Sequence, residues 1–300
     1  MNVKAQRCGF IAIVGAPNVG KSTLLNRIVG SKVSIVSPKV QTTRTRVLGI
    51  AQHDRAQLIF IDTPGIFTPR RRLDRAMVAA AWTGAEDADT TLMVIDAKRG
   101  IDRDSERIIA RFKADGRRVV LVLNKIDLVK KADLLAQISR LDEEGIFSET
   151  FLVSAETGDG VGDLLDALAA RVPEGPWHYP EDQLSDMNDR LLAAEITREK
   201  LYLQLHQELP YAATVETEEW EERPDGSVAI RQVIFVERDS QKGIILGKGG
   251  ARIKQIGAAS RLELEEILER RVHVFLFVKV REKWGDDPDR YRDWGLDYDA

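Results

Sequence analysis

Glycines, a lysine and hydroxyl residues come together near the start of the chain, where residues 11–23 read I-A-I-V-G-A-P-N-V-G-K-S-T. The glycines allow the backbone N–H groups to point at phosphate oxygens, and the helix that follows adds the partial positive charge of its N-terminus. A lysine after the second glycine can reach the β and γ phosphates, and the next hydroxyl can coordinate Mg²⁺. The stretch predicts a phosphate-binding loop formed by Gly15, Ala16, Pro17, Asn18, Val19, Gly20, Lys21, Ser22 and Thr23.

A second polar motif, D-T-P-G, follows the apolar run 57–61. A carboxylate at the end of a strand beside a phosphate loop is placed to hold the hydration shell of Mg²⁺, because this hard cation keeps most of its waters. The glycine can bring a backbone N–H close to a γ-phosphate. We therefore expect nucleotide contacts from Asp62, Thr63, Pro64 and Gly65.

A third motif, N-K-I-D, follows the apolar run 119–123 and is suited to binding a base. The carboxylate of Asp127 can accept hydrogen bonds from N1–H and the 2-amino group of guanine, whereas adenine would leave it unpaired. Asn124 can stabilise the loop, and the stem of Lys125 can cover the base. Ser154 and Ala155 follow the run 150–153, where a backbone N–H can meet guanine O6.

The elements that must position these motifs are short apolar strands that alternate with amphipathic helices over residues 1–172. This pattern predicts an α/β domain with a mostly parallel sheet covered by helices. Each motif follows a strand, at the edge where open α/β sheets bind ligands. The proline-rich stretch 173–184 is typical of a linker.

Residues 185–284 predict a smaller α+β domain, and residues 285–300 an acidic tail. We expect a helix from Ser185, a strand over 212–222, a turn at 224–226 and a strand over 228–236. A helix entered through Gly247–Gly250 and an alternating strand over 272–280 follow.

The G-K-G-G turn at 247–250 lies in a local basic region, because residues 238–254 hold five basic side chains and one acidic one. A glycine turn allows close approach to phosphates, basic side chains hold them, and apolar side chains contact unstacked bases of single-stranded RNA. The alternative is a turn with glycines for geometry alone. The expected RNA contacts are Ile245, Gly247, Lys248, Gly249, Gly250, Arg252 and Lys254.

The overall composition limits the remaining classes of function. A net charge of −4 and a pI near 5.8 argue against nucleic-acid binding over the whole surface. Cys8 is the single cysteine, and the four histidines show no zinc-ligand spacing. No apolar run approaches the ~18 residues that cross a bilayer. We expect a cytoplasmic protein.

The ordered motifs GAPNVGKS, QTTR, DTPG, NKID and SA resemble those of translation-factor-related GTPases. The resemblance implies Mg²⁺-dependent binding of GTP and GDP, hydrolysis of GTP, and two switch segments, 33–46 and 62–75, that the γ-phosphate orders. It implies metal contacts from Ser22, Asp62 and either Thr42 or Thr43, with Thr43 preferred. Lys21, Gly65 and Thr43 would serve catalysis.

One position departs from the Ras-like pattern. Ile66 stands where Ras-like enzymes place the glutamine that orients the attacking water, so we expect slow hydrolysis. Backbone groups, a switch loop, a partner or a cation would complete the site. Some relatives with an asparagine at the place of Asn18 recruit K⁺ beside the phosphates, which makes K⁺ a candidate second cation.

The order of elements in the second half resembles a type II KH domain, and the whole chain resembles the Era-like family of bacterial GTPases. This resemblance implies a monomer that binds 16S rRNA near its 3′ end and acts in assembly of the 30S subunit. It also implies peripheral association with the inner face of the membrane. The alternatives are a membrane-associated signalling GTPase and a tRNA-modification GTPase, neither with specific rRNA binding. The second half shows no thiol, metal or acid/base constellation for modification chemistry.

Overall fold

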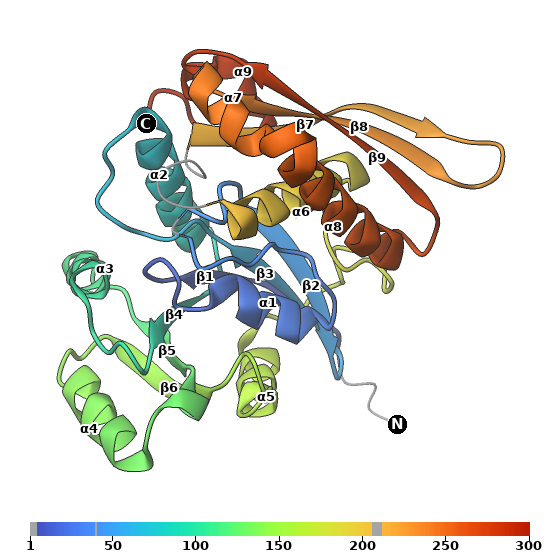
Figure 1. The fold of residues 1–300 in the computed structure, drawn as a ribbon. Coiled ribbons are helices and arrows are strands. Elements are labelled where there is room, and N and C mark those ends of the chain that lie inside the picture. Colours follow the sequence, from blue (N-terminus) through green and yellow to red (C-terminus); the bar gives the residue numbers. More distant parts are fainter. Residues whose placement is uncertain (1–4, 40, 206–211) are drawn as a thin grey trace. The chain divides into compact units, whose positions relative to one another are not determined.

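The computed structural model describes residues 5–39, 41–205 and 212–300. The chain divides into two compact units. The first comprises Met1–Ser34, Thr43–Asp186 and Tyr291–Ala300, and the second comprises Ile35–Thr42 and Met187–Arg290. Each unit contains its own β-sheet (Figure 1).

The first unit has a six-stranded sheet in the order β2-β3-β1-β4-β5-β6. Only β2 runs antiparallel to its neighbour, so the predicted mostly parallel sheet is confirmed. The chain contributes a polar motif after β1, β3 and β5, which brings the motifs to one edge of the sheet. The strands are β1 (Arg7–Val14), β2 (Val47–His53), β3 (Ala56–Asp62), β4 (Thr90–Asp96), β5 (Val119–Asn124) and β6 (Phe147–Val153).

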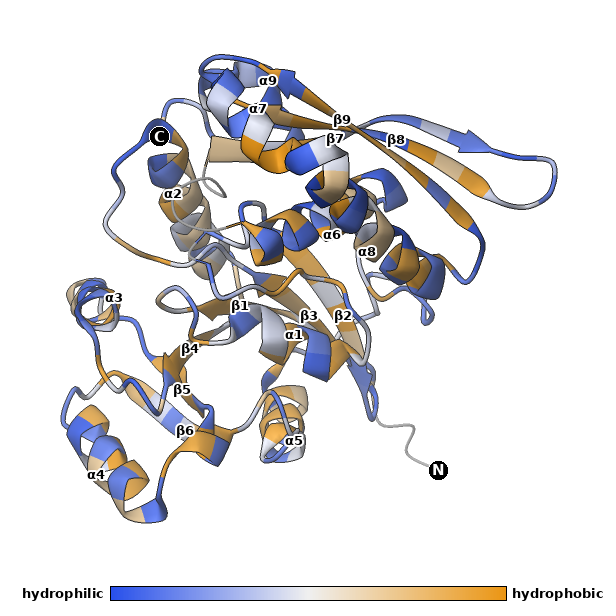
Figure 2. Cartoon of the chain, in the orientation of Figure 1, coloured by the Kyte–Doolittle hydropathy of each residue, from blue (hydrophilic) through white to orange (hydrophobic). Residues whose placement is uncertain are grey.

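Helices cover both faces of this sheet, and the strands between them are predominantly hydrophobic (Figure 2). Buried residues of α2, α3 and α4 form one core with alternate residues of β1, β4 and β5, while α1 and α5 contact β2 and β3. The turn η1 (Ile126–Leu128) follows β5. The helices are α1 (Lys21–Val29), α2 (Arg72–Glu86), α3 (Arg103–Ala114), α4 (Lys131–Asp142) and α5 (Val161–Arg171).

The second unit has a three-stranded sheet in the order β7-β8-β9, with β7 antiparallel and β9 parallel to β8. Its helices pack on the face that carries Val228, Ile230 and Val272. The elements are α6 (Asp189–Gln204), β7 (Ala213–Glu222), β8 (Val228–Val236), α7 (Asp239–Leu246), η3 (Lys248–Gly250), α8 (Ala251–Leu268), β9 (Val272–Val280) and η4 (Trp284–Asp286).

The structure corrects the predicted boundaries at four places. Helix α6 begins at Asp189, with Asn188 as its cap, and not at Ser185. Residues 173–184, predicted to be a linker, belong to the first unit, where Gln57 binds the backbone of residues 178 and 179. The acidic tail contains helix α9 (Pro288–Asp293), and Tyr291–Ala300 joins the first unit. Segment Ile35–Thr42 joins the second.

Candidate functional site

The phosphate loop connects β1 to α1 and has the backbone shape that its glycines predict. Gly20 adopts φ +95°, and an added Cβ would lie 2.3 Å from Nδ2 of Asn124. Lys21 is buried, and its Nζ donates to the carbonyls of Gly15 at 3.1 Å and Ala16 at 3.0 Å. Burial lowers the pKa of Lys21 to about 8, against the opposing charge of Asp62. The ammonium group of Lys21 therefore lies within the phosphate loop, bound to its backbone.

Three hydroxyl groups surround the carboxylate of Asp62 at the end of β3. Ser22 and Ser34 donate to Oδ2 of Asp62 at 2.6 and 2.9 Å, and Thr43 donates at 3.4 Å. The oxygens of Ser22 and Thr43 lie 2.9 Å apart. Burial raises the pKa of Asp62, and Lys21 and the three hydroxyls oppose this rise. This set brings together the three predicted metal residues and adds Ser34, which the sequence did not single out.

The carboxylate of Asp62 also has an oxygen that is available to a cation. Its other oxygen, Oδ1, is buried and has no hydrogen-bond partner among the residues that the structure describes. An oxygen donor set of hydroxyls and one carboxylate is the chemistry that Mg²⁺ prefers, with waters completing its octahedron. Within the described ranges, no three His, Cys, Asp or Glu side chains gather into an alternative metal site. The residues present therefore fit Mg²⁺.

The D-T-P-G turn packs against the phosphate loop. The backbone N–H of Ile66 donates to the carbonyl of Gly15 at 3.1 Å, and a Cβ added at Gly65 would lie 3.0 Å from Cα of Pro17. Thr63 has a structural contact, because its hydroxyl donates to the carbonyl of Ile13 at 2.8 Å. Ile66 is buried in the core of the first unit, so its side chain offers nothing to an attacking water.

Asn124 joins the phosphate loop to both base-binding motifs. Its Nδ2 donates to the carbonyl of Val19 at 2.9 Å, and its Oδ1 accepts from the backbone N–H groups of Lys125 at 2.8 Å and Ala155 at 2.9 Å. Ala155 is one of the two residues expected near guanine O6, and its N–H therefore already has a partner within the protein. One buried amide fixes three loops.

The predicted base-binding carboxylate lies beside this amide. Asp127 is exposed, and its Oδ1 accepts a 2.6 Å hydrogen bond from Ser154. Lys125 donates to the carbonyl of Asn18 at 2.8 Å and pairs with Asp96 at 2.7 Å. Asp96, at the end of β4, was not among the predicted site residues. Its only sequence signal was its place at a strand end.

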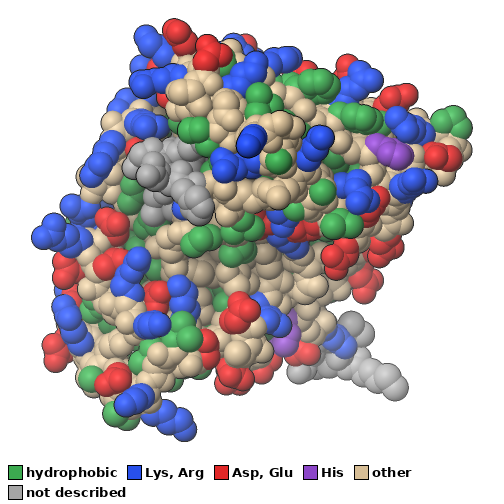
Figure 3. Space-filling model, in the orientation of Figure 1, with side chains coloured by type: hydrophobic (Ala, Val, Ile, Leu, Met, Phe, Trp, Pro, Cys, Tyr) green, Lys and Arg blue, Asp and Glu red, His purple; other side chains and the backbone are tan. Residues whose placement is uncertain are grey.

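A second group of predicted residues lies at the turn between α7 and α8 and at the adjoining ends of these two helices. An added Cβ at Gly247 (φ +68°) would lie 2.9 Å from Cβ of Arg252. Lys248 and Lys254 are exposed, whereas Arg252 is half-buried and donates to the carbonyl of Ile244 at 2.7 Å. Basic and hydrophobic side chains share the surface over α7 and α8 (Figure 3).

The predicted RNA contact at Ile245 is wrong. Its side chain is completely buried in the core of the second unit, with Ile256 of α8 and Val278 of β9. The neighbouring Ile244 is 48% exposed. The sequence indicated two adjacent apolar residues, but it did not indicate helix α7, which turns the second of them inward.

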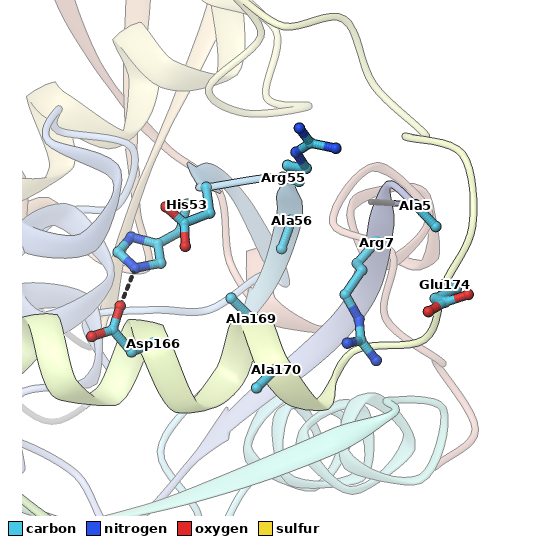
Figure 4. Close-up of a pocket in the computed structure, with 10 residues that line it drawn as sticks. Ala5, Arg7, His53, Arg55, Ala56, Asp166, Ala169, Ala170 and Glu174 are labelled. Carbon is cyan, nitrogen blue, oxygen red and sulfur yellow. Dashed lines mark hydrogen bonds and ion pairs between the residues drawn. The ribbon is translucent and has the colours of Figure 1, made fainter. Parts of the chain in front are cut away.

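A separate cavity of about 1050 Å³ lies where β1 and β3 begin, at the sheet edge opposite the motifs (Figure 4). His53 and Asp166 face each other there at 2.6 Å, and Arg7 and Arg55 also line it. None of the residues that the motifs single out lines this cavity.

Comparisons with known proteins agree with this geometry. A profile described as a 50S ribosome-binding GTPase matches residues 10–125, and a KH domain profile matches residues 208–285. GTPase Era of Sinorhizobium medicae is 63% identical over 292 residues, which cover 97% of this chain and 94% of the relative. The chain belongs to the Era family of GTPases.

Other Era proteins give the same result. GTPase Era of Mesorhizobium japonicum is 61% identical over 294 residues, covering 98% of this chain and 95% of the relative. Two solved structures are each 40% identical, with TM-scores of 0.91 and coverage of 97% of this chain and 99% of theirs. One is an Aquifex aeolicus Era variant bound to GDP and aluminium fluoride. The other is Era with MgGDPNP and nucleotides 1506–1542 of 16S ribosomal RNA.

Proposed function

We propose that this Era-family GTPase binds Mg²⁺·GTP, hydrolyses it slowly, and uses the two nucleotide states to control its binding of 16S rRNA. The observation that carries the nucleotide half is the side chain of Asn124, which holds the phosphate loop and both base-binding motifs together. Lys21 binds the β and γ phosphates, and Asp127 selects guanine by accepting from its N1–H and 2-amino groups.

Ser22, Thr43 and Asp62 hold Mg²⁺ in this proposal, and Ser34 holds the carboxylate of Asp62 in place. The bound ion neutralises charge that develops on the phosphate oxygens. Thr43 is better placed than Thr42, because the hydroxyl of Thr42 donates to the carbonyl of Lys39 at 2.6 Å. GDPNP with magnesium occupies a related Era protein, which supports this assignment.

Because Ile66 is buried and apolar, backbone groups and a cation must orient the attacking water. Under the family resemblance, K⁺ bound near Asn18 supplies positive charge beside the phosphates. We expect GTP turnover at least about tenfold faster in K⁺ than in Na⁺ buffer of equal ionic strength, since a tenfold change corresponds to about 1.4 kcal/mol of transition-state stabilisation. Equal rates in the two buffers would eliminate the potassium site.

The RNA half of the proposal rests on the glycine turn 247–250 between α7 and α8. The backbone approaches phosphates at this turn, and exposed Lys248 and Lys254 add charge. Exposed Ile244 replaces Ile245 as the apolar contact for an unstacked base. A structure of a related Era protein with a 16S rRNA segment supports single-stranded rRNA as the ligand.

The test is a double variant, Lys248→Asp with Gly249→Asp. A Cβ at Gly249 meets nothing within 4 Å, and aspartate is among the residues that tolerate positive φ, so the turn should still fold. Reversing a phosphate contact should weaken binding of the 3′-terminal 16S rRNA oligonucleotide at least about tenfold. Lys130→Asp, which repeats the lysine-to-aspartate change at an exposed position of the first unit, is the control. Unchanged RNA affinity in the double variant would refute the RNA site.

We further propose that the chain acts as a cytoplasmic monomer on the 30S subunit during its assembly. The family resemblance also implies peripheral association with a membrane, which co-sedimentation with anionic vesicles tests. None of the helices in the described residues has the length and apolar character needed to cross a bilayer.

A further inference from the structure

Segment Ile35–Thr42 lies in the sequence between two stretches of the first unit, but it packs as part of the second unit. Ile35 is 3% exposed, and it packs in the same core as Ile196 of α6, Val228 of β8 and Leu264 of α8. This buried contact makes the middle of the predicted first switch a structural part of the RNA-binding unit.

Two polar side chains of α6 hold the backbone at both ends of this segment. Glu199 accepts a 2.8 Å hydrogen bond from the N–H of Val36, and Nη2 of Arg198 donates to the carbonyl of Thr42 at 2.6 Å. Both α6 side chains are almost fully buried, at 3% and 1% exposed. Hydrogen bonds from buried charged groups are among the strong ones, because little water competes for them.

The two α6 residues are themselves fixed. Nε of Arg198 donates to Glu195 at 2.8 Å, and its guanidinium lies 5.1 Å from the centre of the Tyr202 ring. Glu199 pairs with Lys200 at 2.8 Å. The donor and the acceptor that reach the segment are therefore also held by other side chains of α6.

The residues that border the segment face the metal site. Ser34 precedes it and Thr43 follows it, and both donate to Oδ2 of Asp62 within the first unit. A single peptide bond separates the carbonyl that Arg198 holds from the hydroxyl-bearing residue at the site. Displacement of the segment from α6 would therefore be transmitted directly to Ser34 and Thr43.

We propose that Arg198 and Glu199 are positioning residues of the GTPase reaction, which hold segment 35–42 on α6 and thereby keep Ser34 and Thr43 at Asp62. The inference rests on the proposed Mg²⁺·GTP binding. Because γ-phosphate and its Mg²⁺ hold switch segments that relax after hydrolysis, this positioning serves the GTP state more than the GDP state. The RNA-binding unit thus supplies part of the support of the nucleotide site.

Affinities of the full-length protein for Mg²⁺·GDPNP and for GDP test this proposal. Arg198→Lys keeps the charge but loses the fork that binds Glu195 and Thr42 together. We expect affinity for GDPNP to fall about tenfold, from loss of one charged hydrogen bond, while affinity for GDP stays within about twofold. Arg261→Lys, which alters an arginine paired with Glu265 inside α8, should change neither.

A matched pair at position 199 separates positioning from folding. Glu199→Gln and Glu199→Ala both lose the ion pair with Lys200, but only glutamine keeps an oxygen that can accept from the N–H of Val36. Glutamine should therefore retain the ratio of GDPNP to GDP affinity, and alanine should lower it about tenfold. Equal losses for both nucleotides, or no loss in Arg198→Lys and Glu199→Ala, would overturn the inference. Failure of the wild type to bind Mg²⁺·GDPNP would instead refute the proposed function.

Discussion

At the scale of single residues, buried side chains organise the nucleotide site through other residues. Asn124 is 1% exposed and reaches Val19, Lys125 and Ala155 with one amide. Loss of this side chain would leave buried backbone groups unpaired, which costs about 1–3 kcal/mol for each. The amide of Asn124 therefore acts mainly by fixing the positions of the loops that form the site.

We propose that Asp127 selects the base, so Asp127→Asn should change the preference from guanine to xanthine. An amide can donate to the 2-oxo group of xanthine, but it cannot accept both hydrogen bonds that guanine donates. We expect GTP affinity to fall at least about a hundredfold, from loss of two hydrogen bonds to a charged acceptor, and XTP affinity to rise. Asp133→Asn, an equal change at an exposed position of α4, serves as the control in equilibrium titrations. Retained preference for guanine in the Asp127 variant would rule out this role.

At the scale of elements, a glycine in the phosphate loop and a glycine in α5 should respond oppositely to substitution by alanine. Gly20 is at φ +95° against Asn124, whereas Gly162 lies in helix α5 with nothing within 4 Å of an added Cβ. Gly20→Ala should lose nucleotide binding and lower the melting temperature, because both backbone and contact are strained. Gly162→Ala should raise the free energy of unfolding by about 0.4–1 kcal/mol. Nucleotide binding by Gly20→Ala at wild-type affinity would contradict the loop geometry.

The sequence predicted the elements whose signal is local. The β1–α1 loop, the β7–β8 hairpin and the alternating strand β9 follow from glycine spacing, turn residues and periodicity. Helix α7 was missed because its short run D-S-Q-K-G-I-I-L contains a glycine and a weak apolar stripe. Helix α6 was begun too early because Ser185 and Asn188 are both capping residue types, and only the structure shows Asn188 accepting from Leu191.

Long-range packing decided what local patterns could not predict. Nothing in the sequence around Ile35 predicts that it is buried, because its neighbours in the core are distant in the sequence. Prolines at 173, 176 and 180 are typical of a linker, yet the segment is fixed by the side chain of Gln57 from β3. Ser34 and Asp96 lie outside every motif, and only the fold brings them to Asp62 and Lys125.

At the scale of the whole molecule, the chain passes between its two compact units after Ser34, Thr42, Asp186 and Arg290. The first two passages bracket the segment docked on α6. If docking favours the GTP state, a ligand that binds the second unit more tightly when the segment is docked must raise GTP affinity, and GTP must raise affinity for that ligand by the same factor. The proposed function therefore requires that nucleotide binding and RNA binding are coupled.

The most direct test measures the affinity of the wild-type protein for a 3′-terminal 16S rRNA oligonucleotide with saturating Mg²⁺·GDPNP and with saturating Mg²⁺·GDP. Fluorescence anisotropy at fixed salt is suitable, with Lys21→Ala as the control that removes the nucleotide response. We predict that RNA binds at least about fivefold more tightly in the GDPNP state, the lower end of typical allosteric coupling. Equal RNA affinities in the two nucleotide states would refute coupling between the nucleotide site and the RNA site.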